Sequence, residues 1–117
     1  MKNFKELKIW QKGLEIAVKS FKLIESFPKE EKFGLSIQIT KAAVSIPSNI
    51  AEGSSRTSEK DYNRFLEIAL GSGFELETQI LIAEAANFGQ KEIRDAILQT
   101  LNEEQKMLAA FMRKLEK

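Results

Sequence analysis

LKIWQKGLEIAVKSFKLI, residues 7–24, is the stretch that decides the fold class. Apolar side chains recur along it at alternating spacings of three and four residues, which is the pattern of an α-helix that buries one face. This row consists of Leu7, Trp10, Leu14, Ala17, Phe21 and Ile24. The helix is expected to end near Pro28, because a proline disfavours helical geometry in the residue before it. The row therefore predicts a bundle helix that faces a core.

The rest of the chain predicts three more helices. They cover residues 31–50, residues 58–87 with an N-cap at Ser58, and residues 91–115. Short connections between helices of this length favour neighbours that run in opposite directions. The predicted fold class is all-α, an antiparallel up-down four-helix bundle that forms a single domain over residues 1–117.

Several positions break the helical pattern. Pro47 lacks an amide proton, so we expect the second helix to kink there rather than end. Gly53 is expected to provide a left-handed C-cap after that helix. Gly71 and Gly73 lie in mid-helix, where each costs about 1 kcal/mol relative to alanine, and they indicate close approach of another helix. Glu104 interrupts the apolar row of the last helix and indicates a solvated bend.

Composition excludes the commonest catalytic chemistries. The chain has no cysteine and no histidine, which removes thiolate nucleophiles, Cys-ligated zinc and the Glu-x-x-His pairs of di-iron bundles. We therefore expect no metal, no cofactor and no enzymatic activity. A carboxylate enzyme stays open as a third function. No apolar run approaches the roughly 18 residues of a membrane span, and the N-terminus lacks an apolar signal region, so we expect a cytoplasmic protein without membrane contact.

Two further apolar rows lie off the predicted core-facing rows of the first and third helices. They consist of Ile9, Ile16 and Leu23, and of Phe74, Leu81 and Phe88. The first lies about 130° from the core-facing row at 100° per residue. A helix that is apolar on two sides must be buried on two sides, which a monomer of 117 residues does not provide. We therefore predict that these six residues form the interface of a homo-oligomer.

Charge is segregated along a chain whose net charge is only +1. Residues 1–41 carry nine lysines against five glutamates, and residues 58–87 carry two basic against six acidic side chains. One side of the first helix is predicted to carry Lys5, Lys8, Lys12, Lys19 and Lys22. Such a row is either an ordinary solvated helix face or, repeated around an oligomer, a surface that binds nucleic-acid phosphates.

Three segments resemble one known family. They are FKELKIWQK at residues 4–12, FPKEEKFGL at residues 27–35 and, most specifically, SIPSNIAEG at residues 45–53. The similarity continues in the family's order to about residue 83. The chain resembles the four-helix-bundle proteins encoded in 23S rRNA intervening sequences.

The resemblance implies a bacterial bundle that assembles as a ring-like homopentamer and has no established enzymatic activity. It is similar in turn to the accessory variability proteins of diversity-generating retroelements, which are basic pentamers that bind nucleic acid and a reverse transcriptase. This chain differs from them in being nearly neutral. The family segment also contains a structural motif around the proline, with Ser45, Ser48, Asn49 and Glu52 expected to bond backbone carbonyls that Pro47 leaves unpaired.

The sequence favours two functions. The first is a non-catalytic homo-oligomer that binds RNA or DNA through the lysine row. The alternative is a protein-interaction scaffold that binds no nucleic acid.

Overall fold

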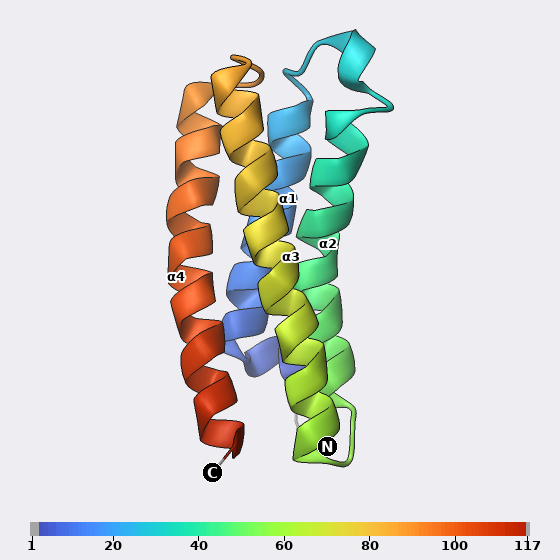
Figure 1. Ribbon diagram of the computed structural model, residues 1–117, viewed down its shortest axis with the longest axis vertical. Helices are drawn as coiled ribbons and strands as arrows, with labels where there is room; N and C mark the ends of the chain where they lie inside the picture. The colour runs from blue at the N-terminus through green and yellow to red at the C-terminus, as the bar shows by residue number, and fades with distance from the viewer. Residues whose placement is uncertain (1–2, 117) are drawn as a thin grey trace.

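Four α-helices dominate residues 3–116, the part of the chain that the computed structural model describes (Figure 1). They are α1 (Lys8–Ile24), α2 (Leu35–Ser54), α3 (Glu59–Ala85) and α4 (Lys91–Glu116), with short 3-10 helices at Phe4–Glu6 and Lys29–Glu31. In Figure 1 the chain runs up α1, down α2, up α3 and down α4. α1 and α3 each pack on α2 and α4, so α1 and α3 lie diagonally opposite. The prediction of an all-α four-helix bundle is confirmed.

The two apolar rows of α1 share the core unequally. Of the row expected there, Ala17 is buried, and Leu7, Trp10 and Ile24 pack at the edge of the core. Ile9, Ile16 and Leu23 are at most 3% exposed, whereas Leu14 and Phe21 are 43% and 50% exposed. The prediction that Ile9, Ile16 and Leu23 form a subunit interface is therefore wrong. Their side chains are already covered by the other helices of the same subunit.

Small residues explain why α1 turns its Ile16 side inward. Gly13, Ala17 and Ser20 are buried on that side, and the Ser20 hydroxyl donates a hydrogen bond to the Ile16 carbonyl at 2.8 Å. The distance between packed helices depends on the side chains at the contact, so small residues allow α2 and α4 to come close. The side with Leu14 offers no comparable row of small residues.

The predicted interface residues of α3 divide into two groups. Phe74 and Leu81 are 52% and 46% exposed, so they stay available to another molecule. Phe88 follows α3 and packs against the core, with its ring centroid 5.7 Å from that of Phe27. Phe88 therefore closes one end of the subunit and does not belong to the exposed row.

α2 continues through Pro47 and ends after Ser54. The bend at the proline stays a prediction. Gly53 lies inside α2 and is buried. Ser55, the residue that caps the end of α2, has a φ of −84°, so the expected left-handed C-cap is absent from this turn. A Cβ on Gly53 would lie 2.9 Å from the Cβ of Phe65. Glycine is therefore needed here because α3 approaches the backbone of α2.

Two expectations about mid-helix positions are wrong. A Cβ on Gly71 would meet nothing within 4 Å, and one on Gly73 would meet Gln105 at an ordinary 3.8 Å. Close approach within the subunit therefore requires neither glycine. Glu104 is 1% exposed and faces the core instead of marking a solvated bend.

The choice of buried row in α1 can be tested with two lysine substitutions. Ile16→Lys should unfold the bundle, because an unpaired buried ammonium costs several kcal/mol out of a total stability of about 5–15 kcal/mol. Phe21→Lys should leave the helix content unchanged, since Phe21 is half exposed. Far-UV circular dichroism and a thermal melt of both variants check this. Equal loss of helix in the two variants would contradict the assignment.

Two glycines form a matched pair for a second test. Gly53→Ala should destabilise the subunit by about 1–3 kcal/mol, because the new methyl group overlaps the Phe65 side chain. Gly71→Ala should stabilise it by about 1 kcal/mol, because alanine favours the helix and its Cβ enters open space. Urea unfolding measures both. Changes of the same sign would show that the α2–α3 distance does not depend on Gly53.

Candidate interaction surfaces

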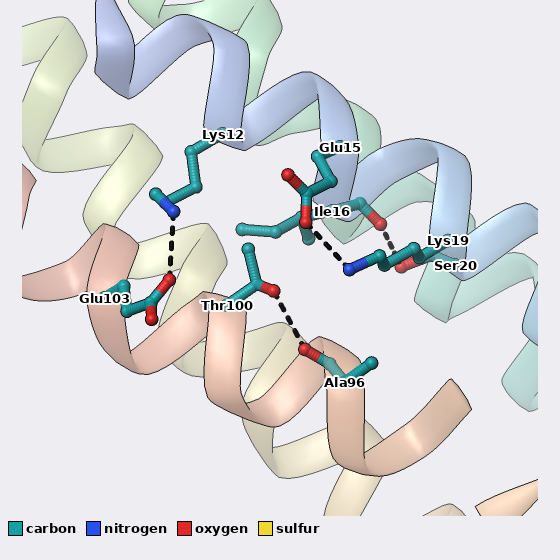
Figure 2. Close-up of polar contacts among 8 residues, drawn as sticks. All are labelled: Lys12, Glu15, Ile16, Lys19, Ser20, Ala96, Thr100 and Glu103. Atoms are coloured by element: carbon teal, nitrogen blue, oxygen red, sulfur yellow. Dashed lines mark hydrogen bonds and ion pairs between the residues drawn. The ribbon is translucent and has the colours of Figure 1, made fainter. Parts of the chain in front are cut away.

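The lysines of α1 lie on the side of the helix that borders α4. Figure 2 shows Lys12 directed at Glu103 of α4 and Lys19 directed at Glu15, one turn earlier on α1. The distances are 2.9 Å from Lys12 Nζ to Glu103 Oε1 and 2.7 Å from Lys19 Nζ to Glu15 Oε2. The hydrogen bond to Glu103 raises the pKa of Lys12, and the hydrogen bond from Lys19 lowers the pKa of Glu15. Two of the five predicted lysines are therefore already neutralised by carboxylates.

The other three lysines of the predicted row have no such partner. Lys5, Lys8 and Lys22 are exposed, and among residues 3–116 none of them forms an ion pair. The row is thus interrupted by two carboxylate-bound lysines, which reduces its positive potential near its middle. Lys5, Lys8 and Lys22 are the members that are available to an external anion.

An apolar groove lies between α1 and α2, on the side of α1 that was predicted to face the core. It encloses about 400 Å³. We name it the α1–α2 groove; the residues that define it are Trp10, Leu14, Val18 and Phe21 of α1 with Val44, Pro47 and Ala51 of α2. Leu14, Val18, Phe21 and Val44 are between 42% and 50% exposed. Sequence reasoning missed this surface, although the small residues on the opposite side of α1 were a readable signal of which row is buried.

A second apolar surface lies on α3 and consists of Phe74 and Leu81, which we call the α3 patch. Glu77 lies between them in the sequence and accepts a hydrogen bond from Gln105 of α4 at 3.0 Å. Residues three and four apart share a side of a helix, so the α3 patch borders α4. α1 and α3 are diagonal neighbours, and the α1–α2 groove therefore lies on the other side of the bundle from the α3 patch.

The structural motif around Pro47 joins α2 to α3. The Asn49 amide donates to the Ser45 carbonyl at 2.8 Å and to the Ser45 hydroxyl at 2.9 Å. The Ser45 hydroxyl lies 2.8 Å from that of Ser72 on α3. Asn49 thus bonds a carbonyl near the proline, but the carbonyl that Pro47 leaves without its helical donor is that of Ala43, so the expectation is not met.

Two other members of the motif differ from the expectation that they bond backbone carbonyls. Glu52 pairs with Arg56 at 2.9 Å instead. Ser48 is exposed and borders the α1–α2 groove. Asn49 is thus the motif residue whose side chain bonds a carbonyl near the proline, that of Ser45.

Residues 3–116 contain neither a membrane-spanning helix nor a metal-binding cluster. Within residues 3–116, no helix combines the length and apolar character that a membrane span requires. Across the same residues, no three His, Cys, Asp or Glu side chains gather so that they could hold a metal ion.

Comparison with known proteins gives a match to a family and a match to a solved structure. The chain is similar to a crystal structure of a protein of unknown function from the S23 ribosomal protein family of Bacteroides thetaiotaomicron VPI-5482. That similarity has a TM-score of 0.79 and 26% sequence identity, and it covers 89% of this chain and 97% of that one. No curated protein sequence matches the chain. The family described as 23S rRNA-intervening sequence protein matches residues 5–110. Because this match covers most of the sequence, the chain belongs to the family of 23S rRNA-intervening sequence proteins.

Proposed function

We propose that this protein is a non-catalytic homo-oligomer in which the α3 patch of one subunit occupies the α1–α2 groove of the next. The observation that carries the proposal is the presence of two different apolar surfaces on opposite sides of one subunit. Burying a large apolar side chain contributes about 1.5–3 kcal/mol. The four exposed side chains of the groove, together with Phe74 and Leu81, therefore offer enough apolar area to stabilise a permanent contact.

Opposite placement of the two surfaces favours a head-to-tail contact. Contacts between unlike surfaces generate closed rings when the rotation between subunits closes. The charge distribution supports the same arrangement, because residues 1–41 carry a net charge of +4 and residues 58–87 a net charge of −4. A groove-to-groove contact would instead bring two positively charged segments together. Five subunits are proposed from the family resemblance.

Light scattering tests the assembly. The unmodified protein should have a mass several times 13.3 kDa at micromolar concentration. Val18→Lys in the groove and Leu81→Lys in the α3 patch should each reduce the mass toward that of one subunit while helix content is retained, because each places an ammonium in an apolar contact. Gln99→Lys, on an exposed position of α4, is the matched control and should keep the full mass. A monomeric unmodified protein would refute the proposal.

Mixing the two interface variants tests the head-to-tail geometry. The Val18→Lys subunit keeps an intact α3 patch, and the Leu81→Lys subunit keeps an intact groove. Their mixture should therefore form a dimer of one subunit of each kind, which extends no further. If grooves met grooves, Leu81→Lys alone would keep the full mass and the mixture would contain no mixed dimer.

Nucleic-acid binding is a second candidate, favoured by three lysines near the N-terminus that have no carboxylate partner among residues 3–116. Lys8 and Lys22 are exposed on α1 and Lys5 on the 3-10 helix before it, and a ring would repeat them once per subunit. Lysine contacts with phosphates release counterions, so affinity falls steeply with salt. The family names refer to 23S rRNA and to a ribosomal protein, which makes structured RNA the first probe to use.

Fluorescence anisotropy with a structured RNA across a salt series tests this candidate. Replacing Lys5, Lys8 and Lys22 by glutamine should weaken binding and lower the salt slope by about 1 for each lysine that contacts a phosphate. The same replacement at Lys60, Lys106 and Lys114, which are exposed elsewhere, is the control. If the unmodified protein binds no RNA at low salt, nucleic-acid binding is refuted. The alternative, a protein-interaction scaffold, then stands.

A further inference from the structure

Three residues that break the pattern of their own helices meet at one point in the core. They are Gly13 of α1, Pro47 of α2 and Glu104 of α4. A Cβ on Gly13 would lie 3.2 Å from Glu104 Oε2 and 3.4 Å from the nitrogen of Pro47. The carboxyl group of Glu104 therefore packs where α1 has no side chain, at a point that the proline of α2 also approaches.

The carboxyl group has no polar partner at this point. The Glu104 side chain is 1% exposed, and within the described part of the chain neither of its oxygens takes part in a hydrogen bond. The side chains that α1, α2 and α3 bury include no acidic or basic group. Arg94 of α4 is also buried, and its guanidinium donates hydrogen bonds to the carbonyl oxygens of Phe88 and Gly89, each at 2.7 Å.

Charged groups on the neighbouring helices are bound to other residues. On the side of α1, Lys12 is held by Glu103 of α4, and Glu15 is held by Lys19. On the side of α3, Glu77 accepts a hydrogen bond from Gln105. From α2, the Pro47 nitrogen and the Ile46 side chain lie close to the space that Gly13 leaves. The cation that acts on Glu104 is Lys12, whose ammonium is already paired with Glu103.

Burial without a partner disfavours the charged form of a carboxyl group. Accordingly, burial raises the pKa of Glu104 to about 8, against the smaller opposing effect of the Lys12 charge. A neutral carboxyl group also has an O–H to donate. Pro47 has no N–H, so the carbonyl of Ala43, one turn earlier in α2, lacks its regular helical donor. The neutral acid thus suits the place where it lies.

We propose that Glu104 is carried as a neutral acid in the folded bundle, with its O–H facing the proline break of α2, and that loss of this proton loosens α4 from α1 and α2. The bound proton thus keeps α4 packed against α1 and α2, and we call this arrangement the latch. The inference does not depend on the proposed assembly, because all three helices belong to one subunit.

The sign of the pH dependence follows from the two states. The unfolded chain releases the Glu104 proton near its ordinary value of 4.5, whereas the folded chain keeps it up to about 8. The stabilisation that the Glu104 proton provides is therefore complete below pH 4.5 and is lost as the pH rises to about 8. The chain has no histidine or cysteine that could titrate in this pH range. The raised pKa of Lys12 lies above the range, and the lowered pKa of Glu15 lies below it.

Urea unfolding of the full chain from pH 5 to pH 9 tests the latch, with light scattering at each pH to separate dissociation from unfolding. The folding equilibrium constant should fall by up to about tenfold per pH unit until about pH 8 and then level off. Glu104→Gln should abolish this slope and be more stable than the unmodified protein at pH 8. Glu92→Gln, at an exposed position of α4 that forms no ion pair among residues 3–116, is the control and should keep the slope.

A direct measurement keeps the inference testable if Glu104→Gln does not fold. The carboxyl carbon of Glu104 in the unmodified protein can be followed by ¹³C NMR as pH is raised. A midpoint well above that of exposed glutamates, accompanied by loss of stability, supports the latch. A midpoint between 4 and 5, or a flat stability profile in the unmodified protein, would overturn it.

Discussion

α1 carries two apolar rows, and a four-helix bundle has one core in which to bury them. Gly13 and Ser20 favour the Ile16 row, because small side chains on that side of α1 allow the neighbouring helices to come close. Once Ile16 points inward, the 100° rotation per residue fixes the rest of the helix. The other apolar row is turned out beside α2, and the lysines are turned toward α4. Both candidate interaction surfaces of α1 therefore follow from this one packing choice.

Most of the fold could be predicted from sequence because the residues that α3 buries follow the helical spacing of three and four. Leu66, Ala69, Leu76 and Ile80 lie where the spacing places them, and Ser58 caps α3 by accepting a hydrogen bond from the Asp61 amide. Periodicity fails on α1, since two rows of similar strength give the same signal and small residues do not register as apolar. The groove was missed for this reason.

The remaining differences concern contacts between residues that are distant in sequence. Lys12 and Glu103 are 91 positions apart, and a helix taken alone shows neither that α4 lies beside the lysines nor that Glu103 reaches them. The burial of Glu104 has the same origin. Its charge suggests solvent, but the missing side chain of Gly13 opens a space for it, and only the packed bundle brings the two together. The C-cap expected at Gly53 was likewise overridden by the approach of Phe65.

Trp10 gives the groove a property that the other apolar residues do not share. It is the single tryptophan of the chain, it lines the α1–α2 groove, and its ring lies edge-on to Phe4 at a centroid distance of 5.2 Å. Indole emission depends on the polarity around the ring, and no second indole contributes to the signal. The intrinsic fluorescence of the unlabelled protein is therefore a built-in reporter of whether the groove is covered or open to water.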